Sequence, residues 1–380
     1  MTLDLSDTII IDNHAHSLLK DFLQLDTLGF RRSFSESRSL SLISEHVNCA
    51  LHYQNMLREL KEIVDFETED ELIEHRQKMS QSEYTKRLWD DSSIGAALID
   101  DGFAPYSMLS LSELDHACGR PVFRIVRIEP ILEALILSCK SLAEAEKKLE
   151  SELIRPLTHR IVGMKTIAAY RGGFPIDLNV ERRSAESSFS ELKRSTANTT
   201  SLRISACPAY HHLLLCAIDI AAANDLPVQI HTGIGDGDLD LHTANPSLLS
   251  PLFKSKRFST CKFVLLHCFP YVREASYLCS VFANVYMDLS LSISLASSIA
   301  PQLFREALSM APATKILAGT DGHSVPETHW YAAITTKKAL SVVLSQYLAE
   351  GYIDLAEGNQ AAESILFRNC RQLYNLEGLV

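Results

Sequence analysis

The stretch that determines the fold is Thr8-Ile9-Ile10-Ile11-Asp12-Asn13-His14-Ala15-His16. Its first four residues are all β-branched and predict a buried strand, and two histidines stand where that strand ends. In an extended strand, residues i and i+2 point to the same face, so His14 and His16 can reach one ion. Neutral imidazole is a good ligand for zinc and other first-row metals. The stretch therefore predicts a strand that ends in metal ligands.

Four further apolar runs lead into a polar residue in the same way. A lysine follows one run, histidines follow two, and an aspartate follows the fourth. These residues are Lys165 after 161–164, His231 after 227–230, His267 after 263–266 and Asp321 after 316–320. Polar residues at the carboxyl ends of buried parallel strands are how (β/α)8 barrels build their active sites.

Short aliphatic runs alternate with helical patterns through most of the chain, which indicates repeated βα units and a parallel sheet. We count eight runs and predict strands at 8–13, 95–99, 122–128, 161–167, 227–230, 262–266, 285–289 and 315–319. Eight strands with intervening helices predict an α/β protein with a closed (β/α)8, or TIM, barrel. The chain is expected to form one domain over residues 1–380.

Two insertions interrupt this rhythm. Residues 17–93 separate the first two strands and contain amphipathic patterns at 42–64 and 72–89, too long for an ordinary loop. They predict a helical cap beside the site. Residues 174–205 are rich in serine, threonine and charge, without an apolar period. We expect this segment to be a polar loop at the active site, either a mobile lid or disordered.

The composition limits the partners of the protein. Its 36 basic and 47 acidic residues give a formal net charge of −11, which argues against nucleic acid or an anionic membrane surface as a partner. A small-molecule substrate is expected instead. The predicted cap offers surface for a homo-oligomer, but no sequence pattern establishes one.

The cysteines indicate a reducing compartment. All nine are scattered, with no CxxC pair, as in a cytoplasmic protein with reduced thiols. The first residues show no secretory signal, and no apolar stretch reaches the roughly 20 residues that a membrane span needs. We therefore expect a cytoplasmic location.

The order of the ligands along the chain resembles that of the amidohydrolase superfamily of metal-dependent barrels. Four segments are similar to its amidohydrolase_2 branch, which includes the amidohydrolase-like portion of FluG-type, glutamine-synthetase-associated proteins. They are Asp12–His16, Ala168–Gly173, His231–Asp236 and Asn284–Asp288. The resemblance covers almost the whole chain.

The resemblance implies a metal-dependent hydrolase that cleaves an amide or other C–N bond of a small carboxylate-bearing molecule. Carbon-carbon lyases occur in the same branch, so a metal-dependent decarboxylase is the alternative. A third interpretation keeps the barrel as a binding module whose partner surface is 17–93. The intact ligands argue against it.

The chemistry of the ligands supports hydrolysis. His14, His16 and His231 would leave one coordination position open on a divalent metal, most simply zinc, which lowers the pKa of bound water to about 7. Asp321 could ligate and also take the proton from that water. His267 would bind a second ion or hydrogen-bond the substrate carbonyl. The sequence therefore leaves open whether there are one or two ions.

Lys165 has two possible roles. In binuclear amidohydrolases, the resemblance implies a carboxylated lysine that bridges two metals. A free ammonium group has no lone pair and would repel a cation. If Lys165 is unmodified, it would bind a substrate carboxylate or pair with an acidic side chain.

Four more polar residues lie at predicted strand ends and are candidates for substrate binding. Tyr170 and Arg171 follow the fourth strand, and a guanidinium group suits a carboxylate. A salt bridge at the barrel rim is the alternative for Arg171. Asp101 and Glu129 end the second and third strands, where they could face the mouth or orient a ligand histidine.

Overall fold

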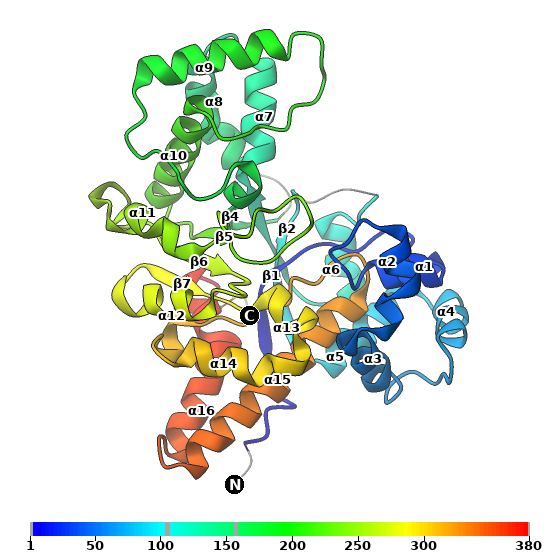
Figure 1. Cartoon of the computed structure of the whole chain (residues 1–380). Helices are drawn as coiled ribbons and strands as arrows, with labels where there is room; N and C mark the ends of the chain where they lie inside the picture. Colours follow the sequence, from blue (N-terminus) through cyan, green and yellow to red (C-terminus); the bar gives the residue numbers. More distant parts are fainter. Residues whose placement is uncertain (1–2, 103–106, 156–158, 379–380) are drawn as a thin grey trace.

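The computed structural model describes residues 3–102, 107–155 and 159–378. A single parallel sheet stands at the centre of the molecule (Figure 1), with seven strands that each pair with the next in the chain. The strands are β1 (Ile10–Ala15), β2 (Ile94–Asp100), β3 (Val122–Arg127), β4 (Ile161–Thr166), β5 (Val228–His231), β6 (Phe263–Leu266) and β7 (Val285–Met287). Most strand residues are buried because helices cover the outer face of the curled sheet.

The eighth predicted strand, 315–319, is not a strand of the sheet. It makes one isolated bridge to β7, and the amide of Leu317 donates to the carbonyl of Met287 over 2.9 Å. On its other side, the amide of Asn13 donates to the carbonyl of Ala318 over 2.9 Å. The amide of Ala318 is directed to a carbonyl of the C-terminal helices instead. This segment therefore bridges β7 and β1 without a regular ladder, and the fold is TIM-barrel-like.

Helices follow the strands through the rest of the chain. The helices between β1 and β2 are α1 (Thr27–Arg32), α2 (Leu40–Glu45), α3 (Leu51–Leu60), α4 (Glu69–Gln77) and α5 (Gln81–Asp91). Those between β2 and β6 are α6 (Leu111–Cys118), α7 (Ile128–Ser138), α8 (Leu142–Leu153), α9 (Arg182–Ser195), α10 (Pro208–Ala223) and α11 (Ser250–Lys254). The remaining helices are α12 (Val272–Val281), α13 (Ser290–Leu295), α14 (Ala300–Leu308), α15 (Pro326–Ala349), α16 (Leu355–Glu363) and α17 (Asn369–Leu373).

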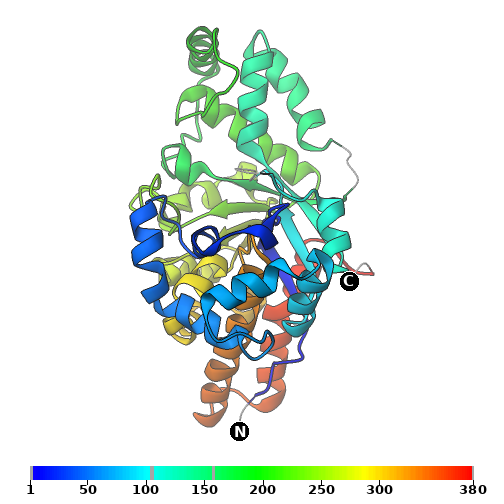
Figure 2. The ribbon, with the colours of Figure 1, turned by 90° about the vertical axis from the view of Figure 1, so that its right-hand side faces the viewer.

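The chain between β1 and β2, residues 17–93, is called the helical segment below. It lies to one side of the sheet in Figure 1 and in front of the strands in the turned view of Figure 2. A buried ion pair joins it to α15, since Nε of Arg76 lies 2.6 Å from Oε1 of Glu327 and both side chains are fully buried. The hydroxyl of Tyr84 donates to the same oxygen over 2.7 Å. These bonds attach α4 and α5 to the body of the protein.

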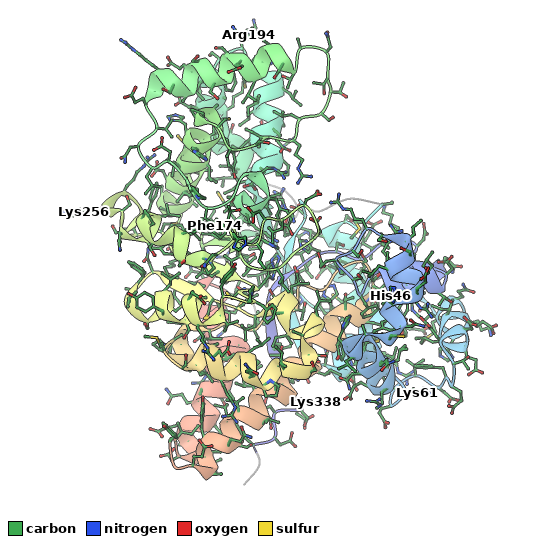
Figure 3. The ribbon with its side chains drawn as sticks, in the orientation of Figure 1. His46, Lys61, Phe174, Arg194, Lys256 and Lys338 are labelled. Atoms are coloured by element: carbon green, nitrogen blue, oxygen red, sulfur yellow. The ribbon has the colours of Figure 1, made fainter. Side chains whose placement is uncertain are left out.

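Residues 174–205 differ from the polar loop that we expected. They contain α9, which packs with α7, α8 and α10 at one end of the molecule, where Arg194 marks it in Figure 3. Only Ala185 and Phe189 of this helix are buried. The rest of the helix is largely polar, rich in serine and charge, and this composition is why the sequence analysis predicted a loop here.

None of the described helices combines the length and the apolar character that are needed to cross a bilayer.

Candidate metal centre

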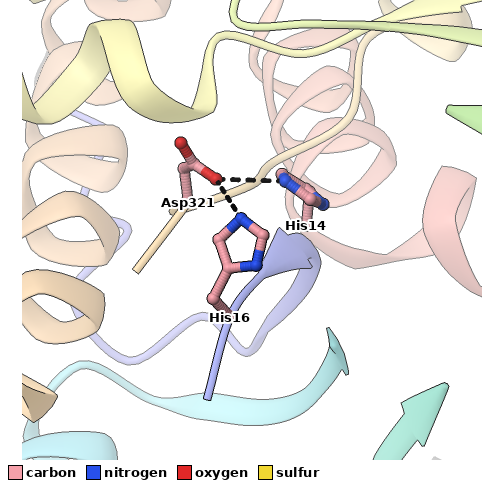
Figure 4. A group of neighbouring side chains, drawn as sticks. All are labelled: His14, His16 and Asp321. Carbon is pink, nitrogen blue, oxygen red and sulfur yellow. Dashed lines mark ion pairs between the residues drawn. The ribbon is translucent and has the colours of Figure 1, made fainter. Parts of the chain in front are cut away.

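Three potential metal ligands meet at the carboxyl ends of the strands (Figure 4). His14 lies in β1, His16 follows it, and Asp321 follows the segment 316–320. Oδ1 of Asp321 lies 3.0 Å from Nε2 of His14 and 3.3 Å from Nε2 of His16. The two-residue spacing of the histidines turns both rings toward the same carboxylate. We call these three residues the strand-end trio.

The surroundings of His14 and Asp321 keep both residues in the protonation states that metal ligands need. Burial and the nearby charge of Lys165 lower the pKa of His14 to about 4, so its ring is neutral near pH 7. Burial alone would raise the pKa of Asp321, but His267 and His14 outweigh it and hold that pKa well below its ordinary value. The trio thus offers a neutral imidazole at His14 and an ionised carboxylate at Asp321.

The geometry of the trio fits a divalent metal. Oδ1 of Asp321 faces two imidazole nitrogens closely, yet among the described residues it has no partner with hydrogen-bond geometry. The buried Nδ1 of His14 also has none. Nitrogen and oxygen atoms that converge without hydrogen-bonding one another are expected where they share a cation, and this donor set suits zinc.

His231 and His267 lie beside the trio and face each other. Nε2 of His231 lies 3.0 Å from the carbonyl oxygen of Ile234, which only accepts, so a neutral His231 carries its proton there. Its Nδ1 lone pair therefore points to Nε2 of His267, 3.0 Å away. Burial lowers the pKa of His231 to about 3 and that of His267 well below its usual value. Both rings are neutral and can serve as ligands or as hydrogen-bonding groups.

Two buried aspartates position the segments that carry these ligands. Oδ1 of Asp12 accepts from the backbone amide of Thr320 over 2.8 Å, which holds the residue before Asp321 against β1. Oδ1 of Asp288 accepts from the backbone amide of His267 over 2.8 Å. Because these carboxylates accept hydrogen bonds from backbone amides, they fix the backbone positions from which the ligand side chains extend.

Lys165 lies at the centre of the site between an imidazole and a carboxylate. Its Nζ is 2.8 Å from Nε2 of His14 and 3.3 Å from Oδ2 of Asp100. Asp100 also accepts from Nη2 of Arg127 over 2.6 Å. Burial lowers the pKa of Lys165, which Asp100 opposes. One buried carboxylate therefore faces two cationic side chains.

The ligands open into a cavity of about 810 Å³ between the strand ends and the helical segment. This volume accommodates a small metabolite. Strand-end residues and the first half of the helical segment supply its polar wall. The polar lining residues are His16, Asp21, Asp26, Arg32, Ser33, Ser35, Glu36, Ser37, Arg38, Ser107, Arg127, Lys165, Tyr170, Arg171, Arg203, His231, Asp236, Asp321, His323 and Ser324.

Two of the four predicted substrate-binding residues line this cavity. The ring of Tyr170 lies 4.8 Å from that of His231, and its hydroxyl accepts from the backbone amide of Asp236 over 3.2 Å. This close approach requires Gly235, because a Cβ there would collide with the Tyr170 hydroxyl. Arg171 reaches the cavity while it pairs with Glu133 at 3.2 Å. Both alternatives for Arg171, cavity wall and salt bridge, are thus combined.

The cavity wall does not include Asp101, which differs from our expectation. Asp101 accepts a 2.6 Å hydrogen bond from Nε of Arg124 on the outer side of the sheet. Alternation along β2 instead directs Asp100 toward Lys165. The predicted position is one residue away from the side chain that reaches the site. A period-two pattern identifies such a pair of faces but not which of them faces inward.

Glu129 is also absent from the cavity wall. β3 ends at Arg127, so Glu129 belongs to the first turn of α7. It is fully buried and accepts hydrogen bonds from Thr166 over 2.5 Å and Tyr210 over 2.9 Å. These contacts connect β4 to α10 and reach no ligand histidine.

The sequence pattern missed cavity residues that come from outside the strand ends. Glu36 lies in the loop between α1 and α2, and Asp236 lies in the loop after β5. The glycines at 233 and 235 indicate a turn after His231, but they do not show that this turn packs against Tyr170. No signal in the sequence marks Glu36, because it belongs to a serine-rich loop whose position depends on how the helical segment packs.

Comparisons with known proteins show what the chain is similar to. Residues 205–376 match the amidohydrolase family. Over 97% of its length, the chain is 29% identical to the protein fluG of Emericella nidulans. The chain spans 46% of fluG, about half the length of this curated relative.

Solved structures share the fold. A candidate metal-dependent hydrolase from Lactobacillus casei ATCC 334 superimposes with a TM-score of 0.89 at 29% identity, over 99% of both chains. A glucuronate isomerase from Caulobacter crescentus gives a TM-score of 0.66 at 15% identity, over 98% of this chain and 92% of its own. The latter likeness concerns the fold alone. These comparisons confirm the predicted resemblance: the chain is similar to the amidohydrolase family over residues 205–376 and to these relatives over almost its whole length.

Proposed function

We propose that this protein is a metal-dependent hydrolase that cleaves an amide or other C–N bond in a small, carboxylate-bearing molecule. The observation that carries the proposal is the strand-end trio at the wall of a metabolite-sized cavity. The match to the amidohydrolase family supports the reaction class. Zinc is the proposed ion, because two imidazoles and a carboxylate suit it.

His14, His16 and Asp321 would hold the ion, which when bound supplies a Lewis acid and an acidified water. Asp321 takes a proton at the oxygen that faces the cavity and returns it to the leaving nitrogen. His231 has its Nε2 proton bonded to the carbonyl of Ile234, and its Nδ1 faces Nε2 of His267 over 3.0 Å. His267 is held in place by Ser290, whose hydroxyl lies 2.7 Å from its Nδ1.

We propose that Lys165 acts as an unmodified ammonium group and that the centre holds one ion. Carboxylation would place an anion beside Asp100, now 3.3 Å from Nζ, in a fully buried environment. Like charges at that distance in a buried site are strongly unfavourable. An ammonium group beside Asp100 and Arg127 would instead attract the substrate carboxylate, with Arg171 as a second contact.

The helical segment has a proposed role as a cap that closes the cavity over the substrate. Its residues from Leu19 to Arg38 line the cavity opposite the strand ends. The cap also offers the surface for a proposed homo-oligomer. A cytoplasmic location is proposed on the nine cysteines, all of which are free thiols.

The first experiment is elemental analysis of the purified protein, wild type beside Lys165→Ala. One zinc ion per chain in both proteins is the expected result. Two ions that fall to one or none in the variant would contradict the mononuclear proposal and favour a carboxylated lysine. No metal after reconstitution with zinc would overturn the proposed function.

The reaction itself is tested with a panel of N-acyl and γ-glutamyl amino acids. Release of an amine that stops on chelation and returns with zinc is expected. Activity that fully resists chelation would contradict a metal-dependent reaction. Release of carbon dioxide without addition of water, from a carboxylate substrate, would favour the decarboxylase alternative.

A further inference from the structure

One acidic residue in the cavity wall has no part in the proposed chemistry. Glu36 lies in the loop of residues 33–39 that joins α1 to α2, and it lines the cavity together with the strand-end residues. This loop reaches the cavity because the helical segment folds over the strand ends. The carboxyl group therefore comes from a part of the chain far in sequence from Asp321, yet it shares the same space.

The Glu36 carboxyl group lacks a compensating partner. Among the described residues, none gives it a hydrogen bond or an ion pair, and the charges that act on it are those of Asp321 and Asp236. Burial, with these two carboxylates, raises the pKa of Glu36 to about 7. No contact among the described residues gives this side chain a structural role, and it is partly exposed where it lines the cavity, so its carboxyl group can meet a bound molecule.

Its two acidic neighbours differ from it in this respect. Asp236 pairs with Arg38, whose Nη2 lies 2.8 Å from its Oδ2. Asp321 faces the imidazoles of His14 and His16. Glu36 alone of these three carboxyl groups has no cationic or imidazole partner among the described residues. A cationic group of a bound molecule would give Glu36 the partner that the other two carboxyl groups already have.

We propose that Glu36 binds a protonated amine of the substrate and thereby selects zwitterionic molecules, such as amino acids with an amide bond. This inference rests on the proposed function and specifies its substrate class. The substrate carboxylate lies toward Lys165 and Arg127, and its ammonium group lies toward Glu36. The cavity wall thus includes the cations of Lys165 and Arg127 and an acid that has no partner among the described residues, which matches a molecule that carries both charges.

The alternative that Glu36 is itself a metal ligand makes a different prediction. Among the described residues, the strand-end ligand group comprises His14, His16 and Asp321 without Glu36. A ligand role would make the metal content depend on Glu36. A role in substrate recognition would leave the metal content unchanged.

The test measures binding by calorimetry to the zinc-loaded protein, with two pairs of probes. L-alanyl-L-alanine is compared with propionyl-L-alanine, and L-asparagine with succinamic acid, so that each pair differs only in the amine. The proteins are wild type, Glu36→Gln and a control, Glu45→Gln, whose side chain is exposed in α2. Glutamine keeps the size of the side chain and removes its charge.

We expect wild type and Glu45→Gln to bind the amine-bearing member of at least one pair about 10-fold or more tightly, as a charge-assisted contact gives. Glu36→Gln should lose this preference and retain its zinc. No preference in wild type for either pair, or an unchanged preference in Glu36→Gln, would overturn the inference. Loss of zinc from Glu36→Gln would also overturn it, since Glu36 would then be a ligand. Failure of the proposed function is read separately, as wild-type protein that takes up no metal.

Discussion

Two clusters of potential metal ligands in this molecule differ in their surroundings. In the strand-end trio and in the second cluster, Glu146, His212 and Cys216, the ligand atoms all lie within 4.8 Å of one another. The second cluster is half-buried between α8 and α10. There Arg182 donates to both carboxylate oxygens of Glu146 over 2.9 and 2.8 Å, and Nε2 of His212 lies 2.6 Å from Oε1.

The comparison shows that closeness of ligands does not by itself make a metal site. The carboxylate of Glu146 already has a full set of donors, and a metal would have to displace Arg182. Asp321 has only imidazoles as described ion-pair partners, and that of His14 is neutral near pH 7. The strand-end trio also borders a cavity, whereas the second cluster does not line it. A candidate metal site therefore differs from a salt-bridge cluster in two ways: its carboxylate lacks a cationic partner, and its ligands border a cavity.

The largest effect is expected from removing one ligand of each cluster. Asp321→Asn should lower turnover at least about 100-fold, because proton transfer is lost, and should reduce bound zinc. His212→Ala should change neither quantity. Elemental analysis and initial rates, with circular dichroism to verify folding, provide the measurement. Equal loss of zinc in both variants would remove the distinction between the clusters.

The next effect concerns the carboxylate that compensates Lys165. Asp100→Asn removes the buried carboxylate that Lys165 and Arg127 both face, so the free energy of unfolding should fall by about 3–5 kcal/mol. Asp101→Asn, one residue away, breaks a partly exposed pair with Arg124 and should cost about 1 kcal/mol or less. Urea denaturation measures both. Equal losses of stability in the two variants would contradict the conclusion that Asp100, and not Asp101, carries the interior charge.

A smaller, graded effect is expected from pH. The pKa of His14 is lowered to about 4 in the folded protein and that of His231 to about 3, against 6.5 for an ordinary histidine. Below pH 6.5 the unfolded chain therefore binds protons that the folded chain does not, so the free energy of unfolding decreases as the pH is lowered. The slope is about 1.4 kcal/mol per pH unit for each residue until the folded pKa is reached.

Urea denaturation of metal-free protein between pH 6.5 and 4 measures this slope. Replacing His14 and His231 together by glutamine should flatten it, whereas replacing the exposed His46, labelled in the helical segment in Figure 3, should not. A slope that stays the same in the double variant would show that other groups take up the protons.

The smallest effect tests whether Arg182 is what keeps the second cluster from binding a metal. Arg182→Gln removes the donor that occupies Glu146, so this variant should bind an additional zinc ion weakly. Its stability should change by less than about 1 kcal/mol, because Arg182 is half-exposed. Zinc titration of Arg182→Gln and of the double variant with His212→Ala measures the difference. Unchanged zinc binding would contradict the charge-balance explanation.

Much of the fold could be predicted because strands and ligands follow local patterns. Seven of the eight predicted strands occur within one or two residues of the expected ranges. The predicted strand at 315–319 did not become a strand because its amide hydrogen bonds are shared between β7 and the C-terminal helices. The helix α9 was missed because its stability comes from packing on α7, α8 and α10 rather than from its own pattern.

The sequence by itself determined the order and the chemistry of the strand-end residues, since the two-residue repeat of a strand turns His14 and His16 to one face. Only the tertiary structure decided that Asp100, not Asp101, faces Lys165, and that Glu36 lines the cavity with no partner among the residues that the structure describes. The physical reason is that inward direction, burial and charge balance depend on which distant segments pack together. Local patterns carry no information about those neighbours.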